Sequence, residues 1–222
     1  PVSTGAAATY MASPTFVDLD MLATTTAGTT TYTPDRGYIG GSNGKMYRIT
    51  DIGSSPSLAT LVDLGSTKPV TAAPSVSADD NSRLWVYFGT GKLLIDSDQV
   101  NTDTQSLVGG KEPIDYSSKA YTNATVLSSN LLDTTDYTVF EGGYVDTDGS
   151  FANGHETIFS SLEADIEQTS SGDSAYDGWI LDMTGGERCI TKPTILGGLV
   201  TFSTYLPDVA DVCKHEGDSY LS

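Results

Sequence analysis

Basic side chains are scarce in this chain. Lysine and arginine together number 11, against 29 aspartates and glutamates, so the 222 residues carry a formal net charge of −18 at pH 7. Phosphate backbones and anionic lipid surfaces are bound mainly through Lys and Arg side chains. The composition therefore predicts no nucleic-acid partner and disfavours anionic membranes. It suits an exposed, soluble protein and is compatible with divalent cations or basic protein surfaces.

Long apolar runs and catalytic motifs are also missing. No stretch reaches the roughly 18 apolar residues that a membrane-spanning helix needs, and no signal peptide is recognisable after Pro1. The two histidines, His155 and His215, lie in polar segments, and the chain has no GxSxG, HExxH or Walker pattern. We therefore expect no membrane span and no enzyme activity.

Cysteine is nearly absent, with Cys189 and Cys213 as the only two. They form no CxxC pair and no cluster with histidine, which argues against a zinc site. Two cysteines in an acidic chain rich in Ser and Thr suit an exported protein with one disulfide bond. Closing a loop of ~25 residues would stabilise the fold by about 3 kcal/mol in the chain-entropy model. We predict this bond; two buried free thiols are the alternative.

The chain does contain a repeated sequence pattern. At Pro14, Pro74 and Pro193, small or polar residues and the proline precede an apolar run, and a second run rich in glycine and aromatic or apolar residues follows. The prolines lie 60 (74 − 14) and 119 (193 − 74) residues apart, so the second gap is close to twice the first. Repeated strand–turn–strand units of this kind are typical of a β-propeller. We predict an all-β fold of consecutive four-stranded antiparallel blades, forming a partial or modified propeller.

Individual segments agree with this prediction. Residues 14–64 contain four expected strands, with a hairpin at Asn43-Gly44, a pair that favours a type I′ turn. Leu84 to Phe88 is apolar throughout, as in a strand covered on both faces. Residues 95–118 are polar and predict loops, and residues 160–167 predict a short helix. Further strands are expected at 136–141, 157–159, 176–183, 194–196, 199–202 and 218–222.

The chain is expected to be a single segment, 1–222, of one such domain within a larger protein. Residues 1–13 predict a linker or the end of a preceding strand. Residues 21–34 are rich in threonine and have no period that would bury one face. They predict a loop insertion with little role in the core.

Five motifs follow one another along the chain. They are Asp35–Gly40 with Asn43–Arg48, Thr71–Pro74 with Val86–Lys92, Asn101–Gln105, Gly178–Met183 with Gly186–Arg188, and Lys192–Gly198. Their order and spacing, over residues 12–222, resemble the C-terminal domain of PilY-type proteins of type IV pili. The resemblance implies a modified β-propeller at the pilus tip and outer cell surface, exported through the periplasm. It also implies support of pilus assembly, adhesion and twitching motility, with minor pilins and host or surface receptors as partners.

Two other functions remain open. One is a quinoprotein-like propeller enzyme, although the repeated tryptophan-bearing docking motif of that class is missing. Trp85 and Trp179 are expected to fill core positions between blades instead. The other is a generic extracellular propeller that binds glycans.

The resemblance also implies a calcium loop where a strand ends in alternating aspartates. These are Asp18 and Asp20, but apolar residues and the Thr-rich insertion replace the ligands that would follow, and Asp35 lies far along the chain. Because calcium takes six to eight oxygen ligands, we expect weak binding or none. Two acidic clusters are alternative sites, although Asx-turns explain them equally well: Asp96, Asp98 and Asp103, and Asp146 with Asp148.

Overall fold

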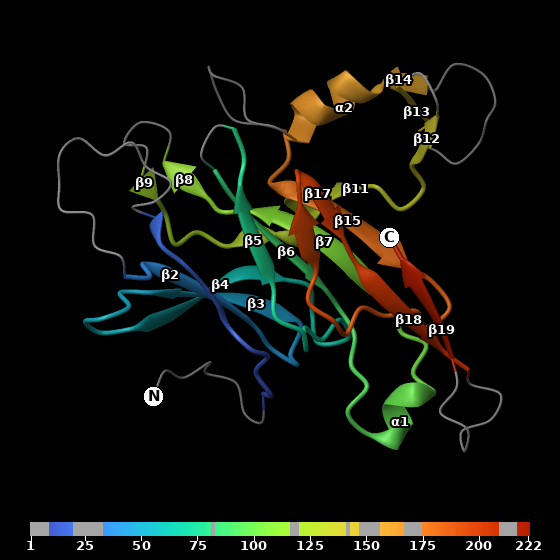
Figure 1. Ribbon diagram of the computed structural model, residues 1–222, viewed down its shortest axis with the longest axis horizontal. Helices are drawn as coiled ribbons and strands as arrows, with labels where there is room; N and C mark the ends of the chain where they lie inside the picture. The colour runs from blue at the N-terminus through green and yellow to red at the C-terminus, as the bar shows by residue number, and fades with distance from the viewer. Residues whose placement is uncertain are drawn as a thin grey trace.

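The fold is all-β with several sheets, as predicted (Figure 1). The computed structural model describes residues 9–19, 33–80, 83–115, 120–140, 143–146, 156–166, 175–208 and 217–222. The Thr-rich segment from 20 to 32 lies outside these ranges, so the predicted loop insertion is not tested. Of the predicted linker, residues 9–13 are described: Met11 forms a β-bridge with Gly41, and the Ala12 N–H donates to the Gly40 carbonyl (2.9 Å).

The first large sheet has the strand order β1-β2-β3-β4-β10. Its members are β1 (Thr15–Val17), β2 (Arg36–Gly40), β3 (Lys45–Thr50), β4 (Ser57–Asp63) and β10 (Val126–Leu127). The first four strands are consecutive in the chain and pair antiparallel, which confirms the four strands predicted between residues 14 and 64. The fifth, β10, comes from a distant segment and pairs parallel to β4.

The second large sheet repeats this design, with the order β11-β15-β7-β6-β5. Its members are β5 (Ser75–Ala78), β6 (Leu84–Gly89), β7 (Gln105–Lys111), β15 (Gly178–Met183) and β11 (Leu132–Asp133). Four strands pair antiparallel and β11 pairs parallel to β15. The predicted four-stranded blades are therefore not confirmed, because each large sheet has a fifth, parallel strand.

Smaller elements surround the two sheets. The remaining strands are β8 (Ile114–Asp115), β9 (Ala120–Tyr121), β12 (Thr138–Phe140), β13 (Tyr144–Asp146), β14 (Glu156–Ile158), β16 (Thr194–Leu196), β17 (Leu199–Thr201), β18 (Ser203–Pro207) and β19 (Gly217–Leu221). They form the sheets β12-β13-β14, β16-β17, β18-β19 and β8-β9. The helices are α1 (Asp96–Gln99), η2 (Ser128–Asn130) and α2 (Phe159–Ile166). The helix predicted at 160–167 is thus confirmed as α2.

The prediction of loops over 95–118 is wrong, because this segment contains β7, a strand of the second sheet. Every residue of β7 is buried, between β6 and β15. Its sequence, Gln-Ser-Leu-Val-Gly-Gly-Lys, has few of the β-branched and aromatic residues that mark strands. Pairing on both edges, rather than propensity, makes this segment a strand.

The hairpin at Asn43-Gly44 is present, but its turn differs from the predicted type I′. Among the described non-glycine residues only Asp51 has a positive φ, so Asn43 does not, whereas Gly44 has a φ of 80°. The Gly44 N–H donates to the Gly41 carbonyl (3.1 Å), and the Gly41 N–H donates to the Lys45 carbonyl (2.9 Å). This is a three-residue loop closed by a glycine in the left-handed region, the second commonest way to join two strands.

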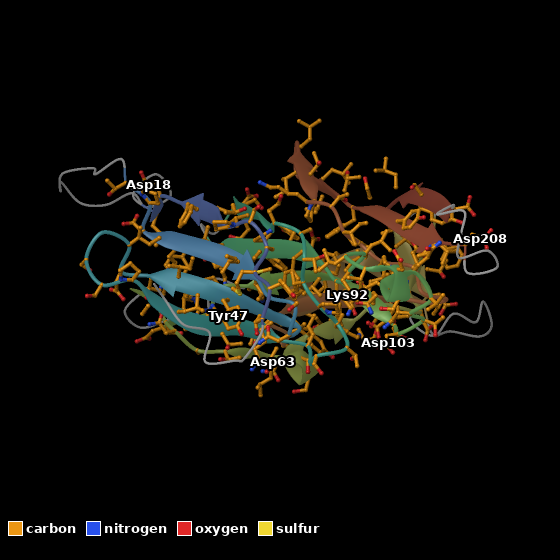
Figure 2. All side chains as sticks on the ribbon, turned by 90° about the horizontal axis from the view of Figure 1, so that it is seen from below. Asp18, Tyr47, Asp63, Lys92, Asp103 and Asp208 are labelled. Carbon is orange, nitrogen blue, oxygen red and sulfur yellow. The ribbon has the colours of Figure 1, made fainter. Side chains whose placement is uncertain are left out.

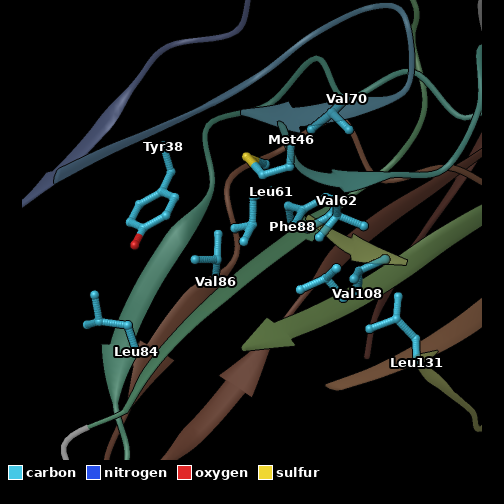
Figure 3. Close-up of a cluster of buried hydrophobic side chains, with 11 residues drawn as sticks. Tyr38, Met46, Leu61, Val62, Val70, Leu84, Val86, Phe88, Val108 and Leu131 are labelled. Carbon is cyan, nitrogen blue, oxygen red and sulfur yellow. The ribbon is translucent and has the colours of Figure 1, made fainter. Parts of the chain in front are cut away.

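The main core lies between the two large sheets. Figure 3 shows Leu84, Val86 and Phe88 of β6 on the side of the strand that faces Tyr38, Met46 and Leu61 of the first sheet. Val62, Val70, Val108, Val126 and Leu131 complete this cluster of buried side chains. Alternate residues of β6 therefore point away from it, toward the opposite face of the second sheet.

A buried ionic cluster joins the sheets beside this core. The carboxylate of Glu112, just after β7, accepts hydrogen bonds from Arg36 of β2 and from Arg48 of β3. All three side chains are less than a tenth exposed. Removing one partner of such a cluster leaves an uncompensated buried charge, so the cluster fixes how the sheets sit against each other.

Candidate functional site

The position implied for calcium lies where the segment between β1 and β2 leaves the first strand and enters the second. We call this place the neck of that segment. The Asp35 N–H donates to the Val17 carbonyl (3.0 Å), and the Leu19 N–H donates to Asp35 Oδ2 (2.8 Å). Asp18 and Asp35 therefore flank the same neck, although 17 residues (35 − 18) separate them in the sequence. Asp20 lies outside the described residues. Asp35 lies too far along the sequence to belong to a contiguous calcium loop; the pairing of the strands before and after the insertion is the signal that points to it.

The second candidate cluster builds a loop of its own. Asp98 is buried, and its Oδ2 accepts hydrogen bonds from the N–H groups of Leu94 (2.9 Å) and Ile95 (3.2 Å), while its Oδ1 lies 2.9 Å from Lys92 Nζ. Burial opposes ionisation, but these three donors together hold the pKa of Asp98 below its usual value. The carboxylate oxygens of Asp98 thus hold the loop, and Asp96 is exposed.

Asp103, the third member of this cluster, closes an Asx-turn. Its N–H donates to Asn101 Oδ1 (2.7 Å), and its Oδ2 accepts a hydrogen bond from Asn101 Nδ2 (3.0 Å). Figure 2 shows Asp103 near Lys92, with Asp18 at the far end of the molecule. Within the described ranges no three His, Cys, Asp or Glu side chains gather as a metal-binding group.

The centre of the loop from 92 to 101 is occupied by a guanidinium group. Arg188 is buried, and its Nη1 donates to the carbonyls of Lys92 (3.0 Å) and Asp98 (2.5 Å). Its Nη2 donates to the Asn101 carbonyl (2.6 Å) and its Nε to the Gly186 carbonyl (2.9 Å). Four carbonyl oxygens thus converge on one cation that the chain itself supplies. Sequence reasoning placed Arg188 in a motif but gave it no role.

The last predicted site residues are divided between described and undescribed segments. Asp146 is buried on β13, opposite Thr138 of β12, and Asp148 lies outside the described ranges. Cys189 is fully buried and has no disulfide partner among the described residues, and burial raises the pKa of this side chain as a thiol. Cys213 also lies outside the described ranges, so the predicted disulfide bond stays a prediction.

An aromatic groove, which the sequence did not predict, covers the face of the second sheet opposite the core. Trp85 and Tyr87 of β6 stack with ring centroids 6.0 Å apart, and Tyr87 lies 6.5 Å from Trp179 of β15. Both Tyr87 and Trp179 pair in register with Gly109 of β7, where a side chain would collide with the Trp179 indole. The two tryptophans are expected in core positions. Trp85 is buried, and Trp179 packs against a second buried cluster formed by Leu107, Met183, Cys189 and Phe202; both also line this groove. The alternation of Trp85 and Tyr87 with aliphatic residues was its signal.

Helix α2 forms the opposite wall of the groove. Phe159, Leu162 and Ile166 recur at intervals of three and four residues, so they share one helix face, and all three line the groove. The space between helix and sheet is about 540 Å³. Val139 and Val145, from the sheet β12-β13-β14, line it as well.

Besides the Tyr176 N–H, which donates to the Asp165 carbonyl (3.1 Å), two contacts hold the ends of α2. The ammonium group of the buried Lys111, at the end of β7, donates to the Ile166 carbonyl (2.5 Å) at the C-terminus of α2 and lies 5.7 Å from the centre of the Trp85 ring. At the other end of the helix, the Phe159 N–H donates to the Gly143 carbonyl (2.8 Å). The C-terminus of α2 is therefore tied to the second sheet, and its N-terminus to the sheet β12-β13-β14.

Known proteins provide independent comparisons. No family model matches the chain. Two proteins of Xylella fastidiosa (strain Temecula1), each named type IV pilus biogenesis factor PilY1 homolog, are similar to it. One is 25% identical over 197 residues, which is 84% of this chain and 14% of that protein. The other is 24% identical over 165 residues, which is 71% of this chain and 10% of that protein. The chain thus spans a small part of each relative.

A solved structure extends this similarity to the fold. The crystal structure of the Pseudomonas aeruginosa PilY1 C-terminal domain superimposes with a TM-score of 0.61 and 18% sequence identity, covering 92% of this chain and 46% of that one. Across the described ranges no helix is long and apolar enough to cross a membrane. The predicted resemblance is therefore confirmed: the chain is similar in sequence to PilY1 homologs and has the fold of a PilY1-type C-terminal domain.

Proposed function

We propose that this chain is a non-catalytic part of a cell-surface protein that supports type IV pilus assembly, adhesion and twitching motility. The observation that carries the proposal is the similarity to a type IV pilus biogenesis factor over 84% of the chain, with the PilY1-type fold. Exposed β-sheets with loops between them provide binding surfaces.

The location and partners follow from the same proposal. A pilus assembly protein acts at the cell surface and at the pilus tip, after export through the periplasm. Its partners are then the minor pilins of the tip complex and host or surface receptors. The strongly acidic composition suits such an exposed position, because net charge keeps proteins soluble and apart.

We also propose that the two large sheets are neighbouring blades of an incomplete propeller. The hydroxyl of Thr15, after Pro14, donates to the Pro74 carbonyl (2.6 Å), and the hydroxyl of Ser75, after Pro74, donates to the Pro193 carbonyl (2.5 Å). The residue after each of the first two prolines is thus bonded to the next proline of the series. The segments that carry the repeated pattern lie side by side, as the innermost strands of successive blades do.

For calcium, we propose weak binding or none at the neck between β1 and β2. Asp18 and Asp35 offer carboxylates there, but one oxygen of Asp35 already accepts the Leu19 N–H. Calcium takes six to eight oxygens, so most ligands would have to come from backbone carbonyls, from water or from the segment beginning at Asp20.

The proposed function is tested in the bacterium that encodes the chain. Removing residues 9–222 from the parent protein should reduce the number of surface pili seen by electron microscopy and the diameter of twitching zones. The matched control replaces the exposed Asp80 by Asn in the intact protein and should leave both unchanged. Normal piliation and twitching after the deletion would contradict the proposal. A bound quinone with dye-linked dehydrogenase activity would contradict the non-catalytic role.

A further inference from the structure

The groove between α2 and the second sheet is already formed and is large enough for a ligand. Its volume of about 540 Å³ falls in the range of binding pockets. The stacked rings of Trp85 and Tyr87, with the tilted indole of Trp179 beside them, form its floor on a sheet whose other face is the main core. Lys111 ties the C-terminus of α2 to the end of β7, and the N-terminus of α2 is bonded to Gly143, next to β13.

The lining is apolar and its open edge is acidic. Val139 is 64% exposed and Phe159 is 46% exposed, so apolar surface remains in contact with water. Glu163 supplies the one charged side chain among the described lining residues. At the edge, burial, Tyr176 and the negative charges of Asp133 and Asp165 raise the pKa of Tyr137. The groove therefore offers a large apolar contact beside several carboxylates.

We propose that this groove binds an amphipathic protein segment that carries apolar side chains and at least one lysine or arginine. The apolar side chains would enter the space between α2 and the sheet, where burial of apolar area provides the binding free energy. The basic side chain would lie near Glu163 and Asp165 at the open edge. This proposal does not depend on a role in pili.

Charge decides among the possible occupants. A second copy of this chain would bring another net charge of −18 to an edge that is already acidic, which is unfavourable. An anionic bilayer would be repelled for the same reason. A segment with basic residues has the complementary charge, and electrostatic attraction also speeds its association.

The chain contains a built-in probe of the groove. It has two tryptophans, Trp85 and Trp179, and both line the groove. A synthetic helical peptide of about 14 leucine and lysine residues, long enough to form a helix on binding, is titrated into the protein while tryptophan emission is recorded. The comparison peptide replaces every lysine by glutamate. Zwitterionic phosphatidylcholine vesicles form a third arm.

The leucine–lysine peptide should shift the emission to shorter wavelength with a saturable curve, and the leucine–glutamate peptide should bind at least about tenfold more weakly. Glu163→Gln should weaken the basic peptide about two- to fivefold, as expected for a partly exposed ion pair, and Asp80→Asn should not. Leu162→Ser, on the groove face of α2, should weaken it further. Equal binding of both peptides, an unchanged affinity in Glu163→Gln, an absent emission change, or an equal shift with the vesicles would each overturn the proposal.

Discussion

At the scale of single residues, the polar groups between Lys92 and Asp103 shape their own loop. Asp98 and Asp103 sit in a cluster that suggests cation binding, yet their oxygens accept hydrogen bonds from the backbone and side chains of their own loop. The cation at the centre is the Arg188 guanidinium. It donates hydrogen bonds to three carbonyls of the loop from 92 to 101 and to the carbonyl of Gly186. Hydrogen bonds to charged groups contribute about 1.5–3 kcal/mol each, which makes them effective in a loop with little core.

Asp98 should make the stability of this loop depend on pH. Because its pKa is lowered in the folded protein, its contribution is complete above the unfolded value of about 3.9 and is lost as the pH falls through the folded value. Asp98→Asn should therefore destabilise the protein by about 1–3 kcal/mol at pH 7. The difference from the wild type should shrink below about pH 3. Thermal melts at both pH values measure this; Asp80→Asn is the control, and an equal deficit at both pH values would argue against it.

The two cysteines give a second test at this scale. If Cys189 and Cys213 are bonded, the denatured but unreduced protein should contain no reactive thiol, and reduction should release two. Cys213→Ser should then expose one thiol without reduction. Alkylation followed by mass spectrometry counts them. Two thiols in the unreduced wild type would favour the alternative of free cysteines.

At the scale of elements, the two glycines of β7 leave room for the side chains that pack on each face of the second sheet. An ideal Cβ at Gly109 would lie 2.5 Å from Trp179 Nε1, whereas one at the neighbouring Gly110 would meet only Val62 Cγ2, at 3.4 Å. Gly109 lets the indole lie flat over the strand and so forms the floor of the groove. The same lack of side chains made β7 look like a loop in the sequence.

Gly109→Ala should displace the Trp179 ring. We expect a loss of roughly 1–3 kcal/mol, as for other overpacked sites, together with a change in tryptophan emission that reports the altered floor. Gly110→Ala, one residue away on the other face of the strand, is the matched control and should change the emission little. If the two variants gave the same emission spectrum, the indole would not be resting on Gly109.

At the scale of the whole molecule, repeated units are interrupted by long insertions. The chain leaves the second sheet after β7, adds the short strand β11 to that sheet, and returns alongside β7 in β15, which pairs with β7 residue by residue. Between them it forms β10, the fifth strand of the first sheet, and α2, the roof of the groove. Because this insertion lies between Pro74 and Pro193, the spacing between these two prolines is close to twice that between Pro14 and Pro74.

Any calcium binding beside β1 would depend on this larger arrangement, because Asp18 and Asp35 are brought to the same end of two strands only by the pairing of β1 with β2. Calorimetry should show weak binding or none, for want of six to eight oxygen ligands. Any binding that occurs should be lost in Asp18→Ala. Micromolar affinity lost in Asp18→Ala would contradict the expected weakness. Binding that survives this change but disappears in Asp96→Ala or Asp146→Ala would place the site in another acidic loop.

The sequence by itself determined the strand-rich class, the positions of most strands and the resemblance to PilY-type proteins, because alternation, turn residues and repeated phrases are local signals. Only the tertiary structure decided which strands join which sheet, that β7 is a strand, and that Arg188 fills the loop from 92 to 101. These depend on pairing between segments far apart in the chain. The groove is of the same kind: its floor comes from β6, β7 and β15 and its roof from α2, and no local pattern states that they meet.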